Sequence, residues 1–260
     1  MLLVAVFAAL PFGPAALPLP RFLTVLCSKA ERCAPGRAGR SRPAVVLLDA
    51  LGTLVELQPP APRLRRLLAQ RGFEVDEGRA AAAFRAEISY YLEHHLEGSD
   101  RERLDDLRDR CAAVMMEALD LPRLDHAGAR EAMLAALEFI PFPDAGPALA
   151  AMSDHALVIV SNWDCSLADW LGPAGLLEHV RAVVTSAEAG VAKPGRGIFE
   201  QALELAGAAP AEAVHVGDSP DNDVAGARAA GIRPVLVVRD GSPPEGVEAV
   251  RSLAELPALL

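Results

Sequence analysis

The chain has 260 residues, a hydrophobic fraction of 52% and a formal net charge of −10. This length allows one large or two modest domains with a substantial core, and the acidic balance argues against nucleic acid as a partner. The four cysteines, at positions 27, 33, 111 and 165, lack metal-type or CxxC spacing. They therefore predict reduced thiols in a cytoplasmic protein.

Residues 1–43 differ from the rest of the chain. They carry six Lys/Arg and one Glu, and the apolar run 1–10 has no basic residue before it and is followed by four prolines up to position 20. The run is too short for a membrane helix, which needs ~20 apolar residues, so no membrane partner is expected. A secretory signal within residues 1–20 is the alternative. We predict a flexible extension or a start codon assigned too far upstream.

The first structured segment is the apolar run Val45–Leu48, which predicts a buried parallel strand. Asp49 comes at its carboxyl end, and a Gly52-Thr53 turn follows. Ligands of open parallel sheets bind at that end. We therefore predict that Asp49 is a nucleophile beside an anion pocket formed by turn amides. Thr53 is expected to bind substrate in this pocket or to support the turn.

The next part of the chain, residues 59–140, shows helical spacing and no strand pattern up to about residue 139. It follows a proline-rich break at 58–62. Helices are predicted over 63–71, 77–96, 100–119 and 126–139. The region therefore divides a core made of residues 44–58 and 141–260.

Strand and helix patterns alternate in the rest of the core. Strands are predicted over 156–160, 181–185, 213–217 and 234–238. Helices are predicted over 145–152 with Asp144 as N-cap, and over 166–171, 195–206, 221–230 and 252–260. This alternation predicts an α/β fold of three layers, in which helices cover both faces of a parallel sheet.

Polar side chains follow the ends of these strands. Ser161 and Asn162 end one strand, Lys193 follows the next after a short loop, and Asp218 ends a third with Asp223 close behind. Lys193 offers a compact positive charge for Asp49 and an anionic group. Ser161 and Asn162 offer hydrogen-bond donors to the same anionic group, and carboxylates suit Mg²⁺.

Taken in order, these four motifs resemble those of the haloacid dehalogenase (HAD) superfamily of hydrolases over about residues 44–240. The helical insertion is similar to the C1 cap of subfamily IA. The resemblance implies a Rossmann-like core and a phosphatase that attacks a small phosphorylated metabolite through an aspartyl phosphate on Asp49. It also implies Mg²⁺ bound by Asp49, Asp218 and the backbone carbonyl of Leu51. Asp223 would act behind these ligands, through hydrogen bonds or water.

The chain departs from the phosphatase pattern at Leu51, where such enzymes usually carry a second Asp as general acid and base. Leucine transfers no proton, so good leaving groups should suffer least. Two alternatives stay open. One is a 2-haloacid dehalogenase, whose halide leaves without a proton, and the other is a non-catalytic member that binds a phosphorylated ligand or a protein.

The predicted cap and core meet near residues of uncertain role. Tyr91, His94 and His95 lie one helical turn apart and face either the pocket or solvent, while Trp163 and Asp164 either meet the cap or pack in the core. Neither the substrate nor the oligomeric state can be read from the sequence.

Overall fold

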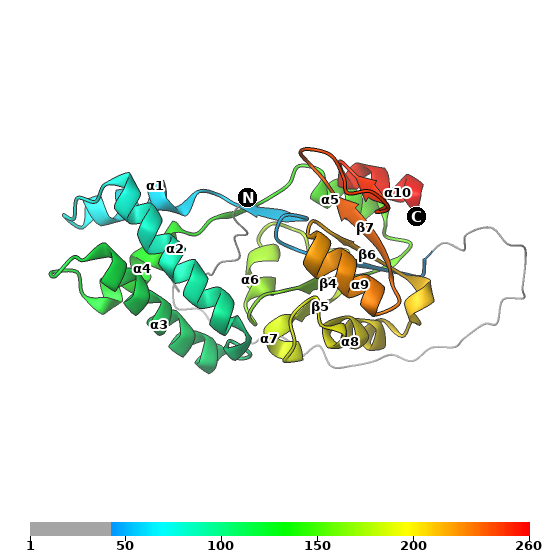
Figure 1. Ribbon diagram of the computed structural model, residues 1–260, viewed down its shortest axis with the longest axis horizontal. Helices are drawn as coiled ribbons and strands as arrows, with labels where there is room; N and C mark the ends of the chain where they lie inside the picture. Colours follow the sequence, from blue (N-terminus) through cyan, green and yellow to red (C-terminus); the bar gives the residue numbers. More distant parts are fainter. Residues whose placement is uncertain (1–42) are drawn as a thin grey trace, which may run out of the picture.

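The computed structural model describes residues 43–260 as a helical cap beside an α/β core (Figure 1). The predictions for the N-terminal extension, for a secretory signal and for Cys27 and Cys33 lie outside these residues. Among the residues described, no helix combines the length and the apolar character that a membrane span requires.

Within residues 43–260 the core contains a six-stranded parallel sheet in the order β5-β4-β1-β6-β7-β8. Its strands are β1 (Val45–Leu48), β4 (Ala156–Ser161), β5 (Val180–Thr185), β6 (Ala213–Gly217), β7 (Arg233–Val237) and β8 (Ala249–Val250). The chain runs from β1 outward to β4 and β5, then returns to the other side of β1 for β6. This reversal places the carboxyl ends of β1, β4 and β6 around one switch point, where ligands of such sheets bind. The predicted α/β class is confirmed.

Side-chain alternation along β1 explains the three layers. Val46 and Leu48 pack on the face covered by α5 and α6, whereas Val45 and Leu47 pack on the face covered by α8 and α9. Successive strand residues point to opposite faces, so a strand covered on both sides is apolar throughout. The helical elements of the core are α5 (Ala145–Ala151), α6 (Leu167–Leu171), α7 (Ser186–Ala189), α8 (Arg196–Ala206), η2 (Pro210–Glu212), η3 (Pro220–Ala225), α9 (Gly226–Ala229), η4 (Leu253–Glu255) and α10 (Leu256–Leu259).

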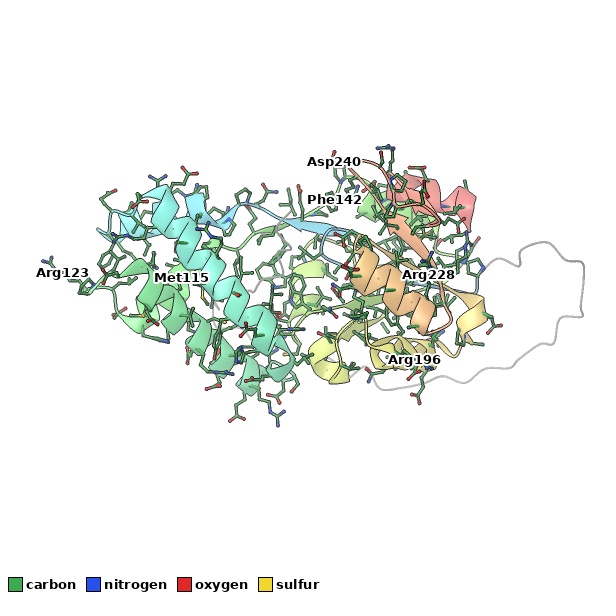
Figure 2. The ribbon with its side chains drawn as sticks, viewed as in Figure 1. Met115, Arg123, Phe142, Arg196, Arg228 and Asp240 are labelled. Atoms are coloured by element: carbon green, nitrogen blue, oxygen red, sulfur yellow. The ribbon has the colours of Figure 1, made fainter. Side chains whose placement is uncertain are left out.

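The cap is a bundle with its own apolar centre, where Met115 is fully buried (Figure 2). The carboxylates of Asp76, Asp100 and Asp125 accept hydrogen bonds from backbone amides in the first turns of its last three α-helices, which fixes where these helices begin. The helical elements of the cap are α1 (Pro60–Gln70), α2 (Glu77–His94), η1 (His95–Glu97), α3 (Arg101–Leu119) and α4 (His126–Ala136).

The two linkers between cap and core pair with each other. β2 (Val55–Leu57) and β3 (Phe139–Pro141) form an antiparallel ribbon, as seen between the two parts in Figure 1. The predicted helix over 126–139 is therefore too long: α4 ends at Ala136, and the pairing with β2 makes 139–141 extended. Neither β2 nor β3 was predicted, since each strand is three residues long and depends on a distant partner.

Asp144 holds the expected N-cap position of α5, but its side chain makes no cap hydrogen bond. The carboxylate accepts hydrogen bonds from Arg239, Ser252 and the amide of Leu253 instead. The prediction of a capping side chain is therefore wrong, because stronger tertiary donors compete for the same oxygens.

Candidate active site

Asp49 lies at the carboxyl end of β1, in the middle of the sheet. Its amide donates to the carbonyl of Val216 in β6 over 2.8 Å, which continues the strand pairing to the last residue before the turn. The turn reverses sharply because Gly52 has a φ of +81°. A Cβ atom on Gly52 would overlap the carboxylate of Asp218. A glycine at this position therefore lets the turn and the acidic loop after β6 approach each other.

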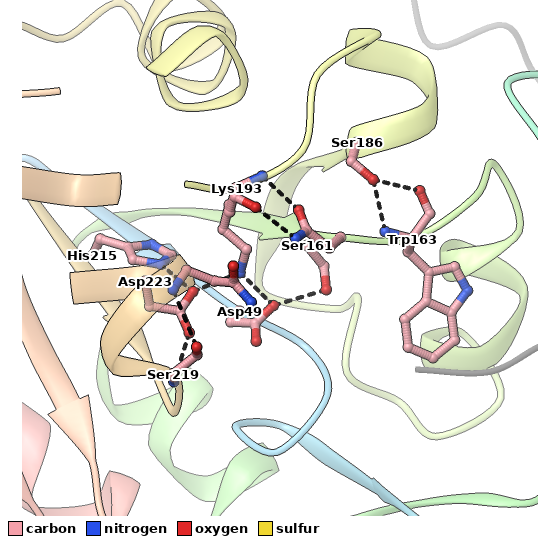
Figure 3. A network of polar contacts seen from close by, with 10 residues as sticks. Asp49, Ser161, Trp163, Ser186, Lys193, His215, Ser219 and Asp223 are labelled. Carbon is pink, nitrogen blue, oxygen red and sulfur yellow. Dashed lines mark hydrogen bonds and ion pairs between the residues drawn. The ribbon is translucent and has the colours of Figure 1, made fainter. Parts of the chain in front are cut away.

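Lys193 joins two carboxylates in the centre of the site (Figure 3). Its Nζ atom lies 2.7 Å from Oδ1 of Asp49 and 2.6 Å from Oδ1 of Asp223. The side chains of Lys193 and Asp223 are each 2% exposed. Residues distant in the sequence thus form one buried ionic group, as the strand-end arrangement predicted.

The carboxylates and the ammonium shift one another's pKa values. Burial raises the pKa of Asp49, while Lys193 opposes this and Asp223 adds to it. Burial alone would lower the pKa of Lys193, but Asp223 and Asp49 outweigh it and raise that pKa. For Asp223 burial is outweighed by Lys193 and His215, so its pKa is lowered. Lys193 is therefore held as the ammonium and Asp223 as the carboxylate.

The acidic residues fit a divalent cation. One oxygen each of Asp49, Asp218 and Asp223 lies within 4.8 Å of the others, and three carboxylates face a single ammonium. Loss of solvation, with Asp49 and then Asp223 nearby, raises the pKa of Asp218 to about 7. A cation with a preference for oxygen ligands would relieve this repulsion.

Asp223 is the least available of the three as a direct ligand. Its Oδ1 receives Lys193 and the Nε2 atom of His215 at 2.8 Å, and its Oδ2 receives the amide of Ser219 at 2.9 Å. Within residues 43–260, Asp49 by contrast makes its side-chain contacts through Oδ1, with Lys193 and the hydroxyl of Ser161. This geometry favours Asp49 and Asp218 as ligands and leaves Asp223 to orient Lys193.

Ser161 and Asn162 are both at the site but make different contacts. Ser161 donates to Asp49 Oδ1 over 2.8 Å. The side-chain amide of Asn162 donates to the carbonyl of Lys193 over 3.0 Å and accepts its N–H over 2.7 Å. Asn162 therefore fixes the backbone of Lys193, a role that the sequence did not indicate.

Thr53 and Leu51 lie in the turn after Asp49. Thr53 is fully buried, and its hydroxyl has no hydrogen-bond partner among residues 43–260, whereas its carbonyl accepts from Arg239 over 2.8 Å. The Leu51 side chain packs against the apolar centres of both cap and core. No proton-transfer group therefore occupies this position in the turn.

Two residues of the site were missed by sequence reasoning. His215 is fully buried in β6 and holds Asp223, with the ring of Phe199 edge-on at 4.9 Å. A polar residue within an otherwise apolar strand was the available signal. Ser219 gave no comparable signal, because its backbone amide makes the contact.

The cap reaches the core through the segment after Asn162. The hydroxyl of Tyr91 donates to Asp164 over 3.1 Å, and both side chains are fully buried. Loss of solvation raises the pKa of Asp164, although Ser166 and Arg108 oppose this. His95 is also buried, whereas His94 stacks on Tyr90 with ring centroids 4.1 Å apart. Tyr91 and Asp164 thus lie at the boundary between cap and core.

Comparison with known proteins agrees with this geometry. A sequence model of haloacid dehalogenase-like hydrolases matches residues 43–231. Haloacid dehalogenase-like hydrolase domain-containing protein 3 of Danio rerio is 45% identical over 109 residues, 39% of this chain and 44% of that protein. The phosphoserine phosphatase of Thermus thermophilus is 50% identical over 76 residues, 29% of this chain and 30% of that enzyme. The matched part of this chain therefore spans less than half the length of these curated relatives.

Solved structures extend the likeness to the cap. The L-2-haloacid dehalogenase of Xanthobacter autotrophicus has a TM-score of 0.64 at 24% identity, over 83% of this chain and 97% of that one. At this identity the likeness establishes the fold alone. With the family match over most of the chain, the conclusion is that this protein belongs to the haloacid dehalogenase-like hydrolase family.

Proposed function

We propose that the protein is a Mg²⁺-dependent phosphatase of a small phosphorylated metabolite. The observation that carries this proposal is the buried group of Asp49, Lys193 and Asp223 with Asp218 at its rim. Phosphoryl transfer needs a positioned nucleophile and positive charge around the transferred group, with little other chemistry. The names of relatives that are phosphatases support the same choice.

The proposed reaction begins with attack on phosphorus by an oxygen of Asp49. The P–O bond to the leaving group breaks as the aspartyl phosphate forms, and water supplies the proton that the leaving oxygen needs. Water then cleaves the aspartyl phosphate, which releases phosphate and restores the Asp49 carboxylate. Lys193 balances charge on Asp49 and the phosphoryl oxygens throughout.

Mg²⁺ would be held by Asp49, Asp218 and the carbonyl of Leu51, with Asp223 behind them. The cation would supply charge neutralisation for the phosphoryl group. Ser161 and Thr53 are proposed to serve the phosphate pocket, and Asn162 to hold Lys193 in place. Because Leu51 offers no proton, aryl and acyl phosphates should be better substrates than alkyl phosphates.

One observation favours a second candidate, a 2-haloacid dehalogenase. The side chain at position 51 is apolar, and a halide leaving group needs no proton. The acidic group around Asp218 counts against it, since attack on carbon with halide departure gains nothing from three carboxylates at one site.

The test measures phosphate release from p-nitrophenyl phosphate with Mg²⁺ and with EDTA, and chloride release from 2-chloropropionate without metal. The Asp49→Asn variant, of nearly the same shape, is the matched control. We expect phosphate release that both EDTA and the substitution abolish. Metal-independent chloride release would establish the dehalogenase. A folded protein that releases neither phosphate nor chloride would favour the alternative of a non-catalytic member that binds a phosphorylated ligand or a protein.

A further inference from the structure

Arg239, which follows β7, links the nucleophile turn to the segment 142–144 between β3 and α5. Its Nη2 atom donates to the carbonyl of Thr53 over 2.8 Å. Its two terminal nitrogens also donate to the carboxylate of Asp144, over 3.0 and 3.1 Å. The guanidinium carbon lies 3.6 Å from the ring centroid of Phe142. One planar group with fixed donor directions thus connects the turn to Phe142 and Asp144.

Asp144, which accepts from Arg239, is held in place by further hydrogen bonds. Asp144 also accepts the Ser252 hydroxyl over 2.7 Å and the Leu253 amide over 2.9 Å, so that its carboxylate is attached to the C-terminal segment. The side chains of Arg239 and Asp144 are only 23% and 16% exposed. Figure 2 shows Phe142 at the edge of the core, near the loop that carries Asp240.

The other acceptor of Arg239, the Thr53 carbonyl, belongs to the turn that shapes the site. Thr53 follows Gly52, whose Cα lies against the Asp218 carboxylate. The next residue, Leu54, accepts a hydrogen bond at its carbonyl from the amide of Phe142 over 2.9 Å. Phe142 directly follows β3, the return linker from the cap. The return linker from the cap is therefore attached to the same turn by a backbone hydrogen bond.

We propose that Arg239 is a positioning residue for the reaction, which keeps the turn 50–54 seated against Asp218 by fixing the carbonyl of Thr53. This proposal rests on the proposed phosphatase activity, because it assigns Arg239 to the spacing between Asp49, Leu51 and Asp218. Arg239 itself touches none of the reacting groups. Small errors in such spacing are costly, since a misplacement of ~1 Å lowers a rate about 10²-fold.

The chain offers a matched control for a purely structural ion pair. Arg233, at the start of β7, donates to Glu248 over 2.7 and 2.8 Å, and these side chains are 28% and 30% exposed. The pair resembles that of Arg239 and Asp144 in geometry and burial, but Arg233 is level with Val214 near the amino ends of the strands, whereas the turn follows the carboxyl end of β1. Arg233→Met should therefore cost similar stability and leave the turn unchanged.

The experiment compares wild type, Arg239→Met, Arg239→Lys and Arg233→Met. Hydrogen exchange is measured at the amides of Gly52, Leu54 and Val55, which are bonded within the turn. We expect at least about 10-fold faster exchange in Arg239→Met and unchanged exchange in Arg233→Met, because local opening reflects local contacts. Equal exchange at these amides in wild type and Arg239→Met would overturn the proposal.

Turnover of p-nitrophenyl phosphate gives the second readout. Arg239→Met should lower kcat by about 10- to 100-fold with a smaller change in KM. Arg239→Lys keeps the charge for Asp144 but loses the planar fork, so an intermediate rate and exchange are expected. If Arg239→Met does not fold, Arg239→Lys decides the question: wild-type kcat and exchange in that variant would contradict the proposal.

These measurements distinguish failure of the proposed phosphatase activity from failure of the proposed positioning role of Arg239. Wild-type protein without phosphatase activity would end the proposed function, while the exchange data would still report whether Arg239 holds the turn. An active enzyme whose turn and kcat are indifferent to Arg239 would end only the positioning role.

Discussion

The ammonium of Lys193 lies 2.7 Å from Oδ1 of Asp49, in a position that is almost closed to solvent. Because two carboxylates share this one cation, its removal leaves uncompensated buried charge as well as an unscreened nucleophile. Lys193 is therefore expected to serve both stability and turnover.

The Lys193→Met variant tests this double role. We expect kcat to fall by about 10²- to 10³-fold, as for the loss of other preorganised charges, and the free energy of unfolding to fall by about 3 kcal/mol or more. Steady-state kinetics and urea denaturation measure the two effects. Arg196→Met, which breaks an exposed pair with Glu200, should cost at most about 1 kcal/mol. Equal losses in both variants would contradict a special role for Lys193.

A second prediction concerns Mg²⁺ and Asp218. Asp218→Asn should stabilise the metal-free protein, since it removes a carboxylate that faces Asp49 and Asp223. It should also abolish the stabilisation by Mg²⁺, which for wild type is about 2.7 kcal/mol at a concentration of 100 Kd. Thermal unfolding with Mg²⁺ or EDTA measures both. The exposed Asp221 provides the control, and Asp221→Asn should keep the response to Mg²⁺. A full response in Asp218→Asn would exclude that ligand.

The apolar residue at position 51 predicts a dependence on the leaving group. Leu51→Asp should raise turnover of alkyl phosphates by about 10- to 100-fold and that of aryl phosphates much less, because only a poor leaving group needs the added proton. Leu51→Asn is the matched control, since it loses the same apolar packing and gains no titratable group. Equal gains on both substrate classes would show that proton transfer is not the missing function.

A pH-dependent stability is predicted for the cap. Glu87 is fully buried, and the Cys111 thiol beside it only partly opposes the effect of that burial on its pKa. Burial raises the pKa of Glu87 from 4.5 to about 8. The folded state therefore binds this proton more tightly than the unfolded state, and wild type loses stability as the pH rises from 4.5 to 8.

Glu87→Gln removes that dependence. The variant should gain stability over wild type progressively across this pH window and by a constant amount above it, with about 1.4 kcal/mol for each unit of pKa shift. Urea denaturation between pH 5 and 9 measures the difference. Glu93→Gln, at an exposed position of the same helix, should show no such trend. A pH-independent difference for Glu87→Gln would mean that the buried carboxyl group is not the cause.

Local patterns determined the fold class and the main strand ends. The apolar run before Asp49 is typical of a strand that is buried on both faces, and alternating strands and helices indicate a parallel sheet. Because all strands of such a sheet end on the same edge, the order Asp49, Ser161, Lys193 and Asp218 already placed these side chains in one region. The helix starts predicted at 77 and 126 match those of α2 and α4, because the start of a helix depends on neighbours within one turn.

Tertiary structure alone decided which partner each polar group took. Asp144 stands where a helix begins, yet it binds Arg239, Ser252 and Leu253, and Asn162 turns to the backbone of Lys193. The ribbon of β2 and β3 likewise exists only because two linkers meet. Such contacts join residues far apart in the chain, and competition among distant donors leaves no periodic trace in the sequence. Sequence patterns report local geometry and burial, whereas hydrogen-bond partners are settled when the elements pack.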